Sequence, residues 1–144
     1  MKYVIFLAAF ITGCATAPAP APAPTPEPAA KPAAPSENVA VAGLMQSARA
    51  DVAAGRLPNA AATLERALRI EPRNPRLWQE LARVRLKQGD YVQAESVAAR
   101  SNSWAGNDTT LRAENWRLIA QAREARGDAE GARTAFETSQ RIGR

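Results

Sequence analysis

The feature that most constrains this chain is a helix–turn–helix unit that occurs three times. Gly55, Gly89 and Gly127 mark the three turns and are 34 and 38 residues apart. Around the turns the sequence is rich in Ala, Leu, Arg, Gln and Glu, which favour helices, and it lacks the Val, Ile and Thr runs typical of strands. A repeat of this length predicts an all-α array of helical hairpins over residues 38–144, in which each pair packs on the next.

The residues within each unit resemble the tetratricopeptide repeat, whose pattern sets Trp, Leu and small residues at fixed positions. The second unit has Trp78, Leu81 and Ala82 before its turn, and Ala94 and Ala98 after it. The corresponding residues of the first and third units are Leu44, Ser47, Ala48, Ala60, Leu64, Trp116, Ile119, Ala120, Ala132 and Phe136. The tyrosine of the family pattern is missing from all three units. The resemblance implies about three repeats, in which the alanines allow paired helices to approach closely.

Proline and polar residues predict where the helices begin. Pro58 and Pro75 suit the first turn of a helix, and Ser36 can cap the first helix. The longer spacing between the second and third turns contains four extra residues, which we expect in a longer loop at residues 101–110. Trp104 lies in that stretch. We expect its ring to pack back over the helix ends, with a contact to a partner as the alternative.

Residues 1–13 have the features of a secretory signal peptide. A lysine at position 2 precedes an apolar run over residues 3–11, which is too short to cross a bilayer of about 30 Å. The run leads into the sequence ITGC, which ends at Cys14 and resembles the lipobox of bacterial lipoproteins. The resemblance implies cleavage before Cys14 and attachment of acyl chains that anchor the protein stably. An ordinary secretory signal that leaves a free thiol is the alternative.

Residues 14–37 carry repeated Ala-Pro units after the cysteine. Each proline fixes φ, removes a hydrogen-bond donor and pushes the preceding residue to an extended geometry. The segment also has little apolar mass to bury, so we expect a disordered tether. At about 3.1 Å per residue in polyproline II geometry, it reaches roughly 75 Å at most. A ligand for an SH3-type domain is less consistent with the sequence, because a basic residue in a PxxP frame is missing.

The residue inventory excludes several kinds of catalytic site. The chain has no His and one Cys, so a Ser-His-Asp triad, a Cys-His pair and a disulfide within the chain are impossible. Carboxylates such as Glu65, Glu80 and Glu95 are scattered singly, and a Gly-rich phosphate loop is missing. We therefore expect no enzyme, no metal site and no cofactor other than the lipid on Cys14.

The basic residues of the repeat block predict a protein-binding groove. The net charge is +5, but bases alternate with acids, so nucleic-acid binding is not expected. Tetratricopeptide arrays bind partners on the concave face lined by the first helix of each repeat. The resemblance therefore implies a groove for an acidic segment of another protein, with an ordinary solvated surface as the alternative. The expected partner contacts are Arg49, Arg76, Gln79, Arg83, Lys87, Arg117 and Gln121. The other groove positions are Met45, Val52, Leu86, Glu114 and Glu124.

The order of signal, spacer and repeat domain resembles the LpoP-type outer-membrane lipoproteins that activate class A penicillin-binding proteins. The resemblance rests on this order and on the repeat pattern. It implies a lipid-anchored regulator in the outer membrane, favoured there over the inner membrane by the alanine after Cys14. Its domain would face the periplasm, and would bind and stimulate a peptidoglycan synthase. A pilotin-like adaptor for a pilus or secretion complex and a peptidoglycan-associated structural lipoprotein remain as alternatives.

Overall fold

The computed structural model describes residues 38–144, so the predicted signal, Cys14 and tether lie outside the described part of the chain. The described residues form six helices, which are α1 (Val39–Ala53), α2 (Leu57–Ile70), α3 (Pro75–Lys87), α4 (Tyr91–Trp104), α5 (Thr109–Ala125) and α6 (Ala129–Ile142). No strand occurs within residues 38–144, and no helix there is long and apolar enough to cross a membrane. The predicted all-α class is confirmed.

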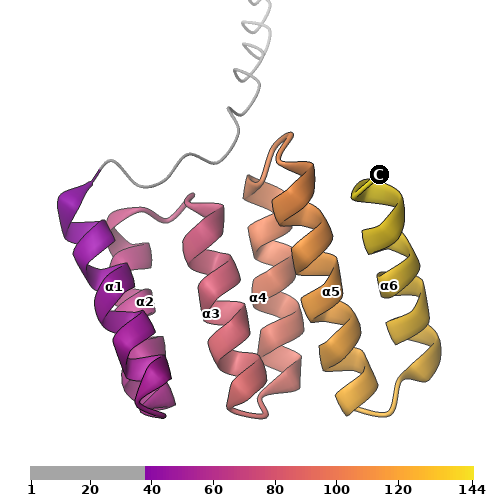
Figure 1. Cartoon of the computed structure of the whole chain (residues 1–144), viewed down its shortest axis with the longest axis horizontal. Coiled ribbons are helices and arrows are strands. Elements are labelled where there is room, and N and C mark those ends of the chain that lie inside the picture. The colour runs from indigo at the N-terminus through magenta and orange to yellow at the C-terminus, as the bar shows by residue number, and fades with distance from the viewer. Residues whose placement is uncertain (1–37) are drawn as a thin grey trace, which may run out of the picture.

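The helices form three antiparallel hairpins that stand side by side along the long axis of the molecule (Figure 1). The pairs are α1 with α2, α3 with α4, and α5 with α6. The first helices, α1, α3 and α5, form one layer, which faces the viewer in Figure 1, and α2 and α4 lie behind it. Each hairpin packs on the next through contacts of α2 with α3 and of α4 with α5. The predicted array of three repeats is therefore confirmed.

The three glycines that revealed the repeat adopt the left-handed conformation that the turns require. Gly55, Gly89 and Gly127 have φ values of 73°, 78° and 83°. A side chain at such a φ is strained, so glycine is favoured where a helix ends and the chain reverses. After the second and third turns, Asp90 and Asp128 accept backbone N–H groups and cap the helices that follow. All three hairpins thus share the glycine turn, and the second and third also share the aspartate cap.

The predicted helix starts are mostly confirmed. Pro58 and Pro75 lie in the first turns of α2 and α3, and the Asn74 side chain caps α3. The first helix differs, because Asn38 and not Ser36 provides its cap. The Asn38 side chain accepts from two backbone N–H groups of the first turn of α1, whereas Ser36 lies outside the described residues.

The four extra residues of the third repeat lie in a helix, and the predicted longer loop at residues 101–110 is wrong. The connection at 105–108 is as long as the one at 71–74, whereas α5 has 17 residues and α3 has 13. Once a helix has formed, each added residue gains one backbone hydrogen bond, so an insertion of about one turn extends it without breaking its register. Asp108 caps this longer helix by accepting from the Leu111 N–H at 2.9 Å.

The aromatic residue in that stretch packs as expected. Trp104 is the last residue of α4, and the guanidinium carbon of Arg73 lies 5.2 Å from the centroid of its ring. Arg73 belongs to the connection between α2 and α3. Trp104 therefore packs back over a neighbouring connection, where the arginine can stack on its π face.

Small residues line the interior of each hairpin. Ala48, Ala82 and Ala120 of the first helices are at most 7% exposed, and Ala60 and Ala94 of the second helices are fully buried. Larger side chains fill the space between repeats, and the largest fully buried ones are Leu64 and Leu77. The burial of these small residues agrees with the predicted close approach of paired helices.

Candidate protein-binding groove

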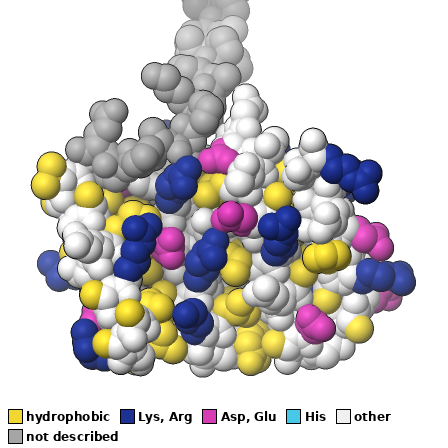
Figure 2. All heavy atoms as spheres, viewed as in Figure 1, with side chains coloured by type: hydrophobic (Ala, Val, Ile, Leu, Met, Phe, Trp, Pro, Cys, Tyr) yellow, Lys and Arg dark blue, Asp and Glu magenta, His cyan; other side chains and the backbone are white. Residues whose placement is uncertain are grey.

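The face formed by α1, α3 and α5 carries basic, acidic and apolar side chains close together (Figure 2). Of the predicted contacts on this face, Arg49, Lys87, Arg117 and Gln121 are exposed. Lys87 and Arg117 form no ion pair with another described residue. These two cations are therefore available to carboxylates of a partner.

Gln79 is buried, so the prediction that it lines an open groove is wrong. Its side chain lies between α3 and α5 and is 5% exposed. The Nε2 atom donates to Glu114 Oε2 at 3.1 Å and to Asn115 Oδ1 at 3.1 Å. Gln79 therefore joins two repeats, because α5 lies across the part of α3 that the residue occupies.

Three of the predicted arginines are paired with carboxylates from the first helix of the next repeat or from its N-cap. The pairs are Arg49–Glu80 at 3.7 Å, Arg83–Glu114 at 2.9 Å and Arg76–Asp108 at 3.6 Å. These ion pairs reduce the basic character that the sequence indicated for this face. Their side chains are partly solvated, so each pair contributes only about 0–1 kcal/mol and can exchange its partner at little cost.

A groove of about 450 Å³ lies between α1 and α3 and is open to solvent. Its residues, which we call the α1/α3 groove, are Met45, Ala48, Arg49, Val52, Ala53, Leu64, Glu80, Val84 and Lys87. Apolar side chains form its floor, and two cations and one carboxylate surround them. The structure brings together four predicted groove positions here, Met45, Arg49, Val52 and Lys87. It places Arg76, Arg117 and Gln121 outside this groove.

Helical spacing explains why these side chains converge. Met45, Arg49 and Val52 follow one another at intervals of four and three residues, and so share one face of α1. Glu80, Val84 and Lys87 repeat the same spacing on α3. Glu80 and Val84 are groove residues that were not predicted, although their helical spacing from Lys87 is a sequence signal for them.

The chemistry of the α1/α3 groove suits a protein segment with an apolar side chain and flanking charges. Ligand sites commonly combine a mostly apolar surface with a few polar groups that set orientation. Within residues 38–144 there is no group of three or more acidic or Cys side chains placed to hold a metal ion. The apolar floor and the charges at the edge of the groove are the features that suit noncovalent binding of a protein segment.

Comparisons with known proteins agree with this architecture. Residues 51–113 match the family model of the tetratricopeptide repeat. No curated protein matches the chain significantly. Among solved structures, the chain is similar to the globular C-terminal domain of P. aeruginosa LpoP, with 45% sequence identity and a TM-score of 0.71. The match covers 73% of this chain and 99% of that domain. The chain therefore belongs to the LpoP family of tetratricopeptide-repeat proteins.

Proposed function

We propose that this protein is an outer-membrane-anchored regulator that binds and stimulates a class A penicillin-binding protein. The observation that carries the proposal is the 45% identity to the LpoP domain, over 99% of that domain. The LpoP-type resemblance implies a peptidoglycan synthase as the partner. A protein-binding repeat array with an open groove on its first-helix face supports this role.

The α1/α3 groove provides a docking site with two separate contributions. Its apolar floor, which includes Met45 and Val52, gains about 25 cal/mol for each Å² of apolar surface that a partner covers. Arg49 and Lys87 at its edge attract carboxylates, which orient the partner and speed its approach. The matching segment of the synthase has an apolar side chain flanked by Asp or Glu.

The anchor proposed for Cys14 gives this domain its place in the envelope. Cys14 and the spacer over residues 14–37 lie outside the described residues. A spacer with a reach of roughly 75 Å lets the domain leave the outer membrane and meet a synthase held in the inner membrane. This reach and the binding groove add support to the role as a regulator.

The test is to add the repeat domain to the purified synthase of the same organism. Residues 38–144 contain one contiguous hydrophobic core, so they can be produced without the anchor and spacer. We expect direct binding and a higher rate of glycan polymerisation or peptide crosslinking. Absence of binding together with unchanged rates contradicts the proposal, and binding of the domain to isolated sacculi alone favours a structural lipoprotein.

A pair of variants locates the site. Lys87→Glu reverses one charge at the edge of the α1/α3 groove. Arg69→Glu reverses a charge at an exposed position of α2, outside the groove. We expect Lys87→Glu to weaken binding by about threefold to tenfold, as an interface charge typically does, and Arg69→Glu to leave it unchanged. Equal effects of the two variants would show that the synthase binds elsewhere.

A further inference from the structure

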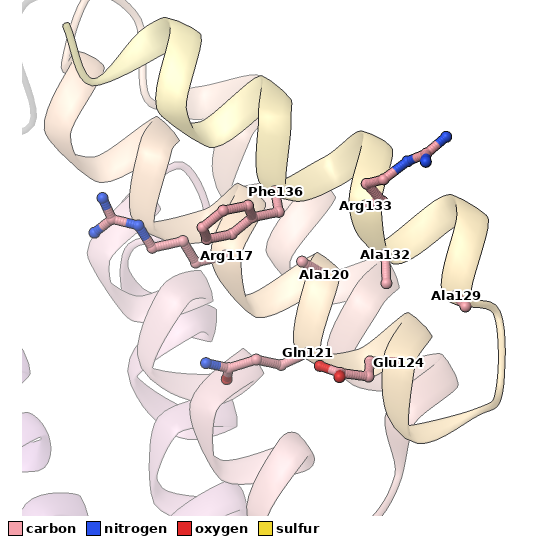
Figure 3. Close-up of a pocket in the computed structure, with 8 residues that line it drawn as sticks. All are labelled: Arg117, Ala120, Gln121, Glu124, Ala129, Ala132, Arg133 and Phe136. Carbon is pink, nitrogen blue, oxygen red and sulfur yellow. The ribbon is translucent and has the colours of Figure 1, made fainter.

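A second groove lies at the end of the array, between α5 and α6. It has a volume of about 480 Å³ and shares no residue with the α1/α3 groove. Its lining includes Arg117, Ala120, Gln121, Ala132, Arg133 and Phe136. We call it the α5/α6 groove. Figure 3 shows the Phe136 ring beside the Arg117 side chain, above Ala120.

The repeat register explains what kind of surface the α5/α6 groove is. The second helices α4 and α6 begin at Tyr91 and Ala129, and the preceding first helices end at Lys87 and Ala125. The same offset of 38 residues therefore relates every position of the second repeat to one in the third. By this offset, Phe136 takes the position of Ala98, which is fully buried in the array.

The same positions of the second repeat hold α5 in place. Arg117 and Gln121 correspond to Gln79 and Arg83, whose side chains both contact Glu114 of α5. Arg133 corresponds to Glu95. The Glu95 carboxylate binds Arg123 of α5 at 2.7 Å and Arg126, the C-cap of α5, at 2.9 Å. The α5/α6 groove is therefore the surface on which the first helix of another repeat would pack.

We propose that an amphipathic helix of a partner protein, with apolar and small residues on one face and carboxylates beside them, docks in the α5/α6 groove as a seventh helix. Phe136 is the apolar anchor, because half of its surface is exposed although its repeat position is an interior one. This surface and its occupant do not depend on whether the α1/α3 groove binds a synthase.

Charge decides the chemistry of the occupant. At both filled junctions the incoming first helix presents an arginine to a glutamate of the preceding second helix, Arg85 to Glu65 at 2.6 Å and Arg123 to Glu95 at 2.7 Å. At the α5/α6 groove, Arg133 stands at the position of Glu95, so the required charge is reversed. Among residues 38–144, the one ion pair of Arg133 is with Glu137 at 3.8 Å, and both side chains are at least 70% exposed. The occupant helix carries Asp or Glu at this place.

A second copy of this chain does not meet these requirements. The helix it could offer is α1. By the 34-residue offset between the first two repeats, Gly43 and Ala50 of α1 correspond to Leu77 and Val84 of α3. Gly43 and Ala50 are exposed, whereas Leu77 and Val84 are buried. Such a face has little apolar surface to bury. Head-to-tail packing of copies would also leave the α5/α6 groove of the last copy unfilled, and would grow into filaments.

The α5 sequence provides the probe for a direct test. Two synthetic peptides cover Thr109–Ala125, one with the native sequence and one with Arg123→Glu, each stapled across the face that does not contact α4. The staple is needed because an isolated helix of this length is marginal in water. Binding to the full-length protein is followed by fluorescence anisotropy. We expect the Arg123→Glu peptide to bind about threefold to tenfold more tightly than the native peptide, because repulsion by Arg133 becomes attraction.

A charge swap in the protein gives the decisive comparison. The variant Arg133→Glu should reverse the preference, so that the native peptide binds more tightly than the Arg123→Glu peptide. Arg141→Glu makes the same change on α6 outside the groove and should leave the preference unchanged. Phe136→Ala should weaken binding of both peptides.

Three results would overturn the proposal. One is that neither peptide binds the wild-type protein, and another is that the preference survives Arg133→Glu. The third is a concentration-dependent dimer of the protein that Phe136→Ala abolishes, because that would make a second copy the occupant.

Discussion

The two filled junctions of the array use opposite chemistry at the same repeat position. Leu77 of α3 and Asn115 of α5 are related by the 38-residue offset, and both are fully buried. Leu77 belongs to the main hydrophobic core together with Leu64 and Val84. Asn115 instead donates to Ser101 Oγ at 2.7 Å and accepts from the Gln79 amide. One junction is held mainly by apolar burial, and the other adds a buried hydrogen-bond network.

This difference shows how a short array combines stability with a defined arrangement of its repeats. Apolar burial is strong but non-directional, so it tolerates small shifts of one helix over another. A buried amide must keep each of its hydrogen bonds, since a lost one leaves a polar group unsatisfied. The network around Asn115 also includes Ser101, whose hydroxyl donates to the Pro75 carbonyl at 2.7 Å. We infer that the second junction sets the position of α5 relative to both helices of the repeat before it.

The largest expected effect in this comparison comes from the apolar junction. Leu77→Ala removes a fully buried side chain from the core and leaves a cavity, so we expect a loss of about 2–5 kcal/mol in the free energy of unfolding. Urea unfolding followed by circular dichroism measures this loss. Leu77→Met nearly preserves the volume and should cost less than about 1.5 kcal/mol. Equal losses for the two variants would show that the junction is not sensitive to packing volume.

The polar junction should respond next most strongly. Asn115→Ala removes the shared partner of Gln79 and Ser101 and should cost about 1–3 kcal/mol. Asn115→Leu imitates the first junction. It should cost less than the alanine variant, because the leucine side chain fills the volume that alanine leaves empty, whereas Ser101 and Gln79 retain another acceptor in both variants. If the leucine variant were the less stable one in urea unfolding, the two junctions would differ in shape as well as in chemistry.

Loss of the ion pairs at the two junctions should have smaller effects on stability, and their dependence on salt distinguishes lost charge interactions from lost packing. Glu95 binds both Arg123 and Arg126, whereas Glu65 has Arg85 as its one ion-pair partner in the described part of the chain. We expect Glu95→Gln to cost up to about 1 kcal/mol and Glu65→Gln about half as much, because these side chains remain partly solvated. Thermal unfolding at low and high salt measures the difference, which should shrink as salt screens the charges. A difference that persisted at high salt would indicate lost packing.

The smallest effect on stability is expected in the α1/α3 groove. Lys87 is exposed and forms no ion pair with another described residue, so Lys87→Glu should change the free energy of unfolding by less than about 0.5 kcal/mol. The same variant should weaken partner binding. A large loss of stability on urea unfolding would mean that Lys87 supports the fold, and the binding result could then no longer be assigned to the groove.

Most of the fold was predictable because its signals are local. The turn glycines, the prolines at the starts of α2 and α3, and the alanines inside each hairpin act over a few residues. The glycines and alanines recur in register, and the structure confirms all three signals. The groove was predicted only in part, because exposure depends on what a neighbouring repeat covers. Gln79 and Arg83 lie one helical turn apart on α3, yet one is buried and the other is partly exposed.

The sequence by itself determined the three helical hairpins and the face that their first helices form, because helix formation and turn closure depend on short-range chemistry. Only the tertiary structure decided which side chains remain open to a partner. It buried Gln79 and paired Arg49, Arg76 and Arg83 with carboxylates. The physical reason is that burial and ion pairing are set by contacts between repeats, and those contacts join residues about 30 positions or more apart in the chain.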